Sequence, residues 1–127
     1  MADVIILGNG PAGISASLYT ARAGLDTLII GSGGGSLKKT GSIENYYGFP
    51  EPIPGKDLIK NGITQAKRLG ISIIEDEVVG ISYDGSFSVK TKSGDYLAPF
   101  AVRATGSSRH TPKIEGIKEF EGKGVSY

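Results

Sequence analysis

Several residue types that carry chemistry are absent or scarce in this sequence. It has no cysteine and only one histidine, His110, among 127 residues. Without cysteine the sequence offers no disulfide, no thiolate nucleophile and no thiolate metal site, and a single histidine cannot build a metal cluster by itself. We therefore expect no metal site and no catalytic residue within these residues, and we interpret His110 as an ordinary loop histidine.

Long apolar runs and an excess of one charge are also missing. Lys and Arg number 14 against 13 Asp and Glu, a net charge of +1, which gives no reason to expect a nucleic acid or an acidic surface as partner. No stretch approaches the roughly 18 apolar residues of a membrane span. The N-terminus lacks the basic and apolar pattern of a signal peptide. We expect a cytoplasmic protein that binds neither nucleic acid nor membrane.

What the sequence has is a globular composition and much glycine. Hydrophobic residues make up 39% and charged residues 21%, which is typical of a folded domain. The length fits one domain or part of one. Because glycine contributes 20 residues, a single glycine motif is weak evidence unless its structural context supports it.

The first part of the chain, residues 2–31, predicts a βαβ unit. Residues 2–7 (ADVIIL) and 26–30 (DTLII) are short apolar runs rich in β-branched residues, as in buried parallel strands. Pro11 suits the first turn of the intervening helix, and Gly24 is placed to end it. The crossover between the two strands is expected to be right-handed.

Residues 8–13 (GNGPAG) lie where the first strand of this unit meets the helix. Gly8 would permit a tight turn, Gly10 would let the backbone approach a pyrophosphate, and Gly13 would let the helix pack closely on the strand. Free N–H groups and the helix dipole favour a diphosphate at this point. The context therefore favours nucleotide binding over a merely structural turn.

One expected part of a dinucleotide site is missing. An acidic residue usually binds the ribose at the end of the second strand, but Gly31 and Ser32 stand there, and Asp26 lies at the opposite end of that strand. We expect the ribose to be held by backbone groups or by Ser32, or else the nucleotide to bind loosely.

The rest of the chain predicts further strands and a second helix. We expect a glycine-rich loop at 31–43, a helix at 54–69, a strand at 71–74, an antiparallel meander at 77–99, and a last strand with a tail at 100–127. The loop has the composition of a flexible linker as well as that of a ligand loop. The predicted fold is α/β: a Rossmann-like parallel sheet with flanking helices and an inserted antiparallel meander.

Two details of this region are also predicted. The alternation of the first meander strand places Val79, Ile81 and Tyr83 on one face. The three successive carboxylates at 75–77 are expected to form a solvated turn, since adjacent extended residues point apart.

Several segments, in order, resemble the low-molecular-weight thioredoxin reductases, flavoproteins of the two-dinucleotide-binding-domain class. GNGPAGISASLYTARAGL resembles their opening, and GGSL resembles their Gly-Gly-Gln-Leu, with Ser36 replacing glutamine. IENYYGFPEPIPGKDL, ATGSSRHTPKIEG and FEGKGVSY resemble later segments, the last of which precedes the redox-active Cys-x-x-Cys. The resemblance covers essentially the whole chain.

The resemblance implies that the nucleotide is FAD, bound non-covalently. It assigns Gly8, Gly10, Pro11, Ala12 and Gly13 to the pyrophosphate; Gly31, Ser32, Gly34, Gly35, Ser36 and Leu37 to the ribose and flavin side, through backbone amides; Asn45 to the isoalloxazine ring; Val78 to the adenine; and Ala104, Thr105 and Gly106 to the cover over the dinucleotide.

The resemblance also implies an activity for a longer parent enzyme. Such an oxidoreductase passes electrons from NADPH through FAD to a cysteine pair, and then to thioredoxin or a similar protein, and it is expected to be a homodimer. The 127 residues lack the redox cysteines and the NADPH domain, so we interpret them as the N-terminal part of its FAD-binding domain. Alternatives are a ferredoxin-dependent flavin thioredoxin reductase, or a non-catalytic nucleotide-binding module or fragment.

Overall fold

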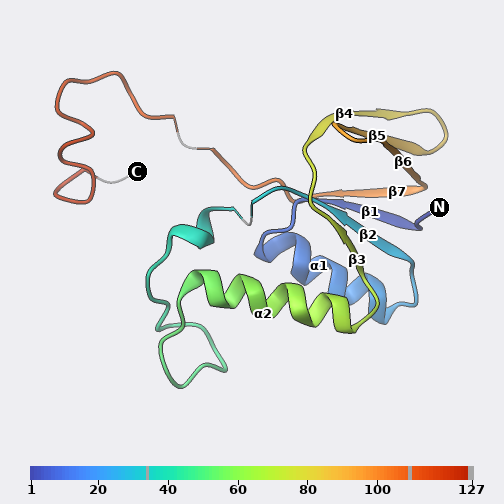
Figure 1. The fold of residues 1–127 in the computed structure, drawn as a ribbon, viewed down its shortest axis with the longest axis horizontal. Helices are drawn as coiled ribbons and strands as arrows, with labels where there is room; N and C mark the ends of the chain where they lie inside the picture. The colour runs from blue at the N-terminus through green and yellow to red at the C-terminus, as the bar shows by residue number, and fades with distance from the viewer. Residues whose placement is uncertain (34, 109, 126–127) are drawn as a thin grey trace.

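The computed structural model describes residues 1–33, 35–108 and 110–125 (Figure 1). Its elements, in chain order, are β1 (Val4–Leu7), α1 (Pro11–Arg22), β2 (Thr27–Ile30), the short 3₁₀ helix η1 (Ser36–Lys39), α2 (Gly55–Arg68), β3 (Ser72–Ile74), β4 (Val78–Tyr83), β5 (Phe87–Thr91), β6 (Asp95–Ala98) and β7 (Phe100–Arg103).

The strands form two sheets. One is parallel, with the order β3-β2-β1-β7, and the other is antiparallel, with the order β4-β5-β6. The antiparallel strands come between β3 and β7 in the sequence, so the meander is an insertion in the parallel fold. The predicted fold class is confirmed.

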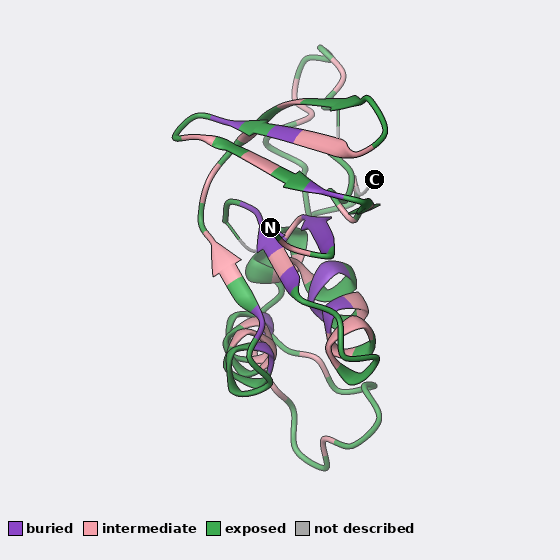
Figure 2. Cartoon of the chain, turned by 90° about the vertical axis from the view of Figure 1, so that its right-hand side faces the viewer, coloured by how far each residue is buried: buried purple, intermediate pink, exposed green. Residues whose placement is uncertain are grey.

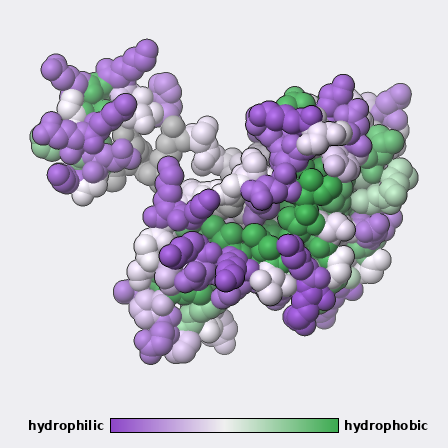
Figure 3. Space-filling view, viewed as in Figure 1, coloured by the Kyte–Doolittle hydropathy of each residue, from purple (hydrophilic) through white to green (hydrophobic). Residues whose placement is uncertain are grey.

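The parallel sheet lies between two different layers. Helices α1 and α2 cover one face, and the meander lies over the other (Figure 1). Figure 3 shows apolar surface concentrated in a band between these two outer layers. The three layers bring β1 into the middle of the molecule, where all four of its residues are buried.

The side chains of β1 alternate between two hydrophobic cores. Val4 and Ile6 belong to the core on the helical side, and Ile5 and Leu7 to the core on the meander side. Successive residues of a strand point to opposite faces, so a strand covered on both faces needs an unbroken apolar run. Figure 2 shows this burial concentrated in the inner strands and on the inward sides of the outer layers.

Helix α1 begins and ends at the expected signals. Pro11 is its first residue, and Gly10 precedes it in an extended conformation. The chain leaves the helix through Gly24, whose φ is +79°, and the Leu25 N–H donates to the Thr20 carbonyl. This is how many helices satisfy their last carbonyl groups.

The first strand of the meander is exposed along one apolar row. Val79, Ile81 and Tyr83 are 57%, 51% and 64% exposed. The register shifts between Val78 and Gly80, so Val79 lies in a bulge. Ile81 lies opposite the fully buried Val89 but is itself exposed, and β4 forms an edge of the meander.

Strand β7 forms an edge of the parallel sheet, with Phe100 63% exposed. After it the chain runs to residue 125 with turns, but without a helix or strand in its described part. Among the residues that the structure describes, no helix is long and apolar enough to cross a membrane.

Candidate nucleotide-binding site

A cavity of about 380 Å³ opens at the carboxyl ends of β1, β2 and β7. In parallel α/β sheets this edge is where ligands bind. The cavity is lined by Leu7, Gly8, Asn9, Gly10, Pro11, Ala12, Ile30, Gly31, Ser32, Gly35, Ser36, Asp76, Glu77, Val78, Ala104, Thr105, Gly106 and Ser107.

The glycine loop after β1 is enclosed by main chain at two of its three glycines. Gly8 has a φ of +117°, and a Cβ atom there would collide with the Ala104 carbonyl. A Cβ atom at Gly13 would collide with the Gly8 carbonyl. These positions therefore exclude any side chain, as predicted for the tight turn and for the close approach of helix and strand.

Gly10 differs from its two neighbours in the motif. It precedes α1 with a φ of −77°, and a Cβ atom built on it would have no heavy atom within 4 Å. No side chain caps this end of α1 within the described part of the chain. The first turn of α1 thus presents its positive dipole end to an open cavity, an arrangement that favours a phosphate group.

Asn9 links this loop to the end of β2. The residue is 8% exposed, and its side-chain amide donates a hydrogen bond of 3.3 Å to the Gly31 carbonyl. The Gly31 N–H in turn donates to the Ile74 carbonyl at 3.1 Å. The ends of β1, β2 and β3 are thereby held together along one side of the cavity.

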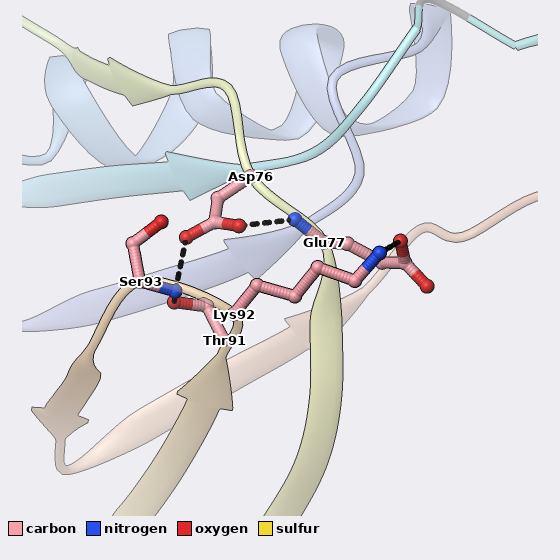
Figure 4. Close-up of polar contacts among 5 residues, drawn as sticks. All are labelled: Asp76, Glu77, Thr91, Lys92 and Ser93. Carbon is pink, nitrogen blue, oxygen red and sulfur yellow. Dashed lines mark hydrogen bonds and ion pairs between the residues drawn. The ribbon is translucent and has the colours of Figure 1, made fainter.

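Residues 75–78, which we call the crossing segment, lead from the parallel sheet to the meander, and the last three of them form a different wall of the cavity. Asp76, Glu77 and Val78 line the cavity. The Asp76 carboxylate accepts hydrogen bonds from the N–H groups of Glu77 (2.7 Å) and Ser93 (3.2 Å) (Figure 4). Glu75 and Glu77 are exposed, as expected of a solvated turn, and the half-buried Asp76 is approached from the meander by the turn between β5 and β6.

The electrostatics of the crossing segment follow from these contacts. The nearby side-chain hydroxyls of Thr91 and Ser93, and then the backbone N–H groups of Glu77 and Ser93, lower the pKa of Asp76 to about 2. The Glu77 carboxylate pairs with the Lys92 ammonium. That hydrogen bond and charge raise the pKa of Lys92. The Asp76 carboxylate is therefore ionised at neutral pH.

The structure brings most of the predicted site residues to the cavity, and three of the described ones it does not. Gly13 lies beneath the glycine loop, in contact range of the Gly8 carbonyl. Leu37 lines a second, largely apolar cavity of about 410 Å³ between α1 and α2. Asn45 is exposed in the loop between η1 and α2. Gly34 lies outside the described residues.

The glycine-rich loop at 31–43 is mostly exposed along its described part, but it contacts the rest of the molecule at several points. Gly31, Ser32, Gly35 and Ser36 line the cavity. Farther along, the Gly55 N–H at the start of α2 donates to the Thr40 carbonyl at 3.0 Å. These contacts favour the ligand-loop interpretation over the linker.

Six cavity residues were missed by the sequence reasoning: Leu7, Asn9, Ile30, Asp76, Glu77 and Ser107. Four of them are direct sequence neighbours of predicted site residues and could have been predicted on that ground: Leu7, Asn9, Ile30 and Ser107. Asp76 and Glu77 directly precede the predicted Val78, but their bonds to the β5–β6 turn depend on tertiary packing.

Arg103 lies at the end of β7. Its Nε–H donates a hydrogen bond of 3.3 Å to the Thr105 hydroxyl, and Thr105 lines the cavity. No group of three or more His, Cys, Asp or Glu residues suited to a metal ion occurs among the described residues.

The sequence from residue 2 to residue 127 matches the pyridine nucleotide-disulphide oxidoreductase family. The chain belongs to this family. It is 42% identical to a thioredoxin reductase of Treponema pallidum over 128 residues, which cover 98% of the chain and 42% of the relative. It is 39% identical to that of Aquifex aeolicus, over 98% of the chain and 40% of the relative.

Solved structures of the family give the same result. The atypical thioredoxin reductase TRi from Desulfovibrio vulgaris Hildenborough matches all of this chain with a TM-score of 0.80 and 43% identity, over 43% of its own length. Lactococcus lactis thioredoxin reductase, in the FR conformation, matches with a TM-score of 0.85 and 35% identity, also over 43% of its length. The resemblance to thioredoxin reductases is thus confirmed, and this chain spans about two fifths of these relatives.

Proposed function

We propose that this chain is the FAD-binding portion of a flavin-dependent thioredoxin or disulfide reductase. One observation carries the proposal. Gly10 borders open space at the N-terminal end of α1, whereas Gly8 and Gly13 are enclosed by main chain. A loop that is enclosed by main chain at its first and last glycines, and has no side chain at its middle glycine, suits a diphosphate that must approach the backbone closely.

The cavity fits the adenosine and diphosphate part of FAD. Its volume, about 380 Å³, is within the usual range of ligand pockets. Residues 10–12 would hold the diphosphate through backbone groups, Ser32 and its neighbours the ribose, and Val78 the adenine. Thr105 and Gly106 would close the opposite side. The assignment of Asn45 to the isoalloxazine ring has the weakest geometric support, because this residue lies outside the cavity.

Bound FAD would supply the redox chemistry, while the residues of this chain would bind and orient it. By analogy with its relatives, the whole protein would take electrons from NADPH and pass them to a cysteine pair and then to thioredoxin. We also propose that it acts as a homodimer. Ferredoxin as donor remains the alternative, and steady-state reduction with each donor in turn separates the two.

The experiment that tests FAD binding is a titration. The purified protein, stripped of flavin, is mixed with FAD, passed through a desalting column and examined by absorbance. We expect flavin absorbance to co-elute with the protein and flavin fluorescence to change on binding. Protein that stays colourless after incubation with excess FAD would refute the proposal.

A further inference from the structure

The crossing segment, residues 75–78, is attached to the rest of the molecule at both ends. At its start, the Ile74 carbonyl accepts a hydrogen bond from the Gly31 N–H. At its end, Val78 begins β4 and packs against the core on the meander side. Between these points, Asp76 and Glu77 form part of a cavity wall. Whatever fixes the middle of this segment therefore also fixes that wall.

The Asp76 carboxylate fixes the middle from two directions. One oxygen accepts a hydrogen bond from the Glu77 N–H within the segment, and the other accepts one from the Ser93 N–H in the turn after β5 (Figure 4). Two further bonds run parallel to this link. The Lys92 N–H donates to the Glu77 carbonyl at 3.1 Å, and the Lys92 ammonium pairs with the Glu77 carboxylate.

The turn that Asp76 contacts is itself well ordered by a buried hydroxyl. Thr91, 6% exposed, donates to the Gly94 carbonyl at 2.8 Å and accepts from the N–H groups of Gly94 (3.0 Å) and Ser93 (3.3 Å). The Thr91 N–H also donates to the Gly94 carbonyl. The turn thus offers a fixed donor, the Ser93 N–H, to the ionised carboxylate of Asp76, and such charge-assisted bonds are stronger than neutral ones.

We propose that Asp76 is a positioning residue for the adenosine end of the nucleotide site, where it holds the backbone of Glu77 and Val78 against the cavity. This inference rests on the proposed function. A second observation supports it: Gly31 and Ser32, which follow β2, provide no carboxylate for the ribose. With that contact absent, the crossing segment carries a larger share of adenosine binding, and its position matters more.

The test compares Asp76→Asn with Glu75→Gln in the flavin-stripped protein. Both changes remove one negative charge from adjacent residues, but Glu75 is exposed and does not line the cavity. FAD is titrated by fluorescence, and ADP, which carries only the adenosine end, is titrated as its competitor. We expect Asp76→Asn to raise the Kd of FAD and of ADP by a similar factor, roughly fivefold to tenfold, and Glu75→Gln to leave both unchanged.

A second variant, Thr91→Val, acts on the same link from outside the cavity. It removes the hydroxyl that orders the turn, so it should weaken FAD and ADP in the same way. The double variant should be no weaker than Asp76→Asn alone, because the two changes break one link. If Asp76→Asn does not fold, Thr91→Val still decides the question.

The outcomes separate the two proposals. If the unaltered protein binds neither FAD nor ADP, the proposed function fails. If it binds both and Asp76→Asn and Thr91→Val bind them equally well, only the positioning role fails. At saturating FAD, the flavin spectrum of Asp76→Asn should match that of the unaltered protein. An altered spectrum would indicate general loosening of the site and would also overturn the positioning role.

Discussion

Two walls of the same cavity are built in opposite ways. At Gly8 and Gly13 the glycine loop meets main chain with no side chain between them, and main-chain carbonyls fix these two positions. The crossing segment at 75–78 is held by side chains, with Asp76 and Lys92 reaching across to backbone and carboxylate partners. The first wall is sensitive to any atom that is added, and the second to any polar atom that is removed or discharged.

The difference follows from what each wall has to do. A diphosphate is bound by backbone N–H groups at a helix terminus, so side chains there obstruct the ligand. The crossing segment instead joins the two sheets, and a few directional bonds set its position. Substitutions in the two walls should therefore have different effects on stability, on FAD affinity and on their pH dependence.

The largest effect is expected for Gly8→Val. The new Cβ would collide with the Ala104 carbonyl, and Val disfavours a φ of +117°. We expect the protein to lose about 3 kcal/mol of stability or more, through strain and overpacking. Chemical denaturation followed by circular dichroism measures the loss, and an unchanged midpoint would show that the loop can move away from β7.

The next effect is expected for Gly10→Val, which changes the ligand site but not the fold. Its Cβ meets no heavy atom within 4 Å and its backbone conformation is ordinary, so the melting temperature should stay close to that of the unaltered protein. The side chain would occupy the cavity, and FAD affinity should fall by roughly 100-fold, or about 2.7 kcal/mol. A Gly10→Val protein that remains yellow after desalting would place the diphosphate elsewhere.

The smallest effect is expected for the pH dependence of Asp76→Asn. The pKa of Asp76 lies at about 2 in the folded protein, against an ordinary value of 3.8. A lowered pKa means that the carboxylate stabilises the fold above its ordinary pKa and that this contribution is lost as the pH falls toward the folded value. The difference in melting temperature between the unaltered protein and Asp76→Asn should therefore shrink between roughly pH 5 and pH 2.

The matched control for this pH experiment is Glu75→Gln. Glu75 is the exposed neighbour of Asp76, and its melting curves should run parallel to those of the unaltered protein over the same range. A constant gap for Asp76→Asn down to the lowest pH would mean that its carboxylate does not stabilise the fold through ionisation.

Much of the fold could be predicted because its signals are local. The apolar run of β1 and the helix start at Pro11 depend on neighbouring residues, and the structure has both elements within a residue or two of the prediction. The helix predicted at 54–69 spans Gly55–Arg68 for the same reason. The exposure of Val79, Ile81 and Tyr83 could not be predicted, since alternation defines a face but not what covers it.

The candidate site also combines residues that local sequence signals predict with contacts that only the tertiary structure reveals. The glycine spacing was visible because all its residues lie in one turn of chain, and so was the loop that follows β2. The link from Asp76 to Ser93 spans 17 residues and two strands, and no spacing rule relates such positions. Asn9 and Gly31, 22 residues apart, are connected only once β1 and β2 are paired.

The exposed edge of strand β7 affects how this protein can associate. It borders the parallel sheet on its outer side, with Phe100 and Val102 exposed. Among the described residues no strand pairs with this margin, and an open strand margin is a template onto which another extended polypeptide can add. An extended segment, from the rest of the protein or from a second molecule, can therefore pair with β7, and a charged residue in place of Phe100 should weaken such pairing.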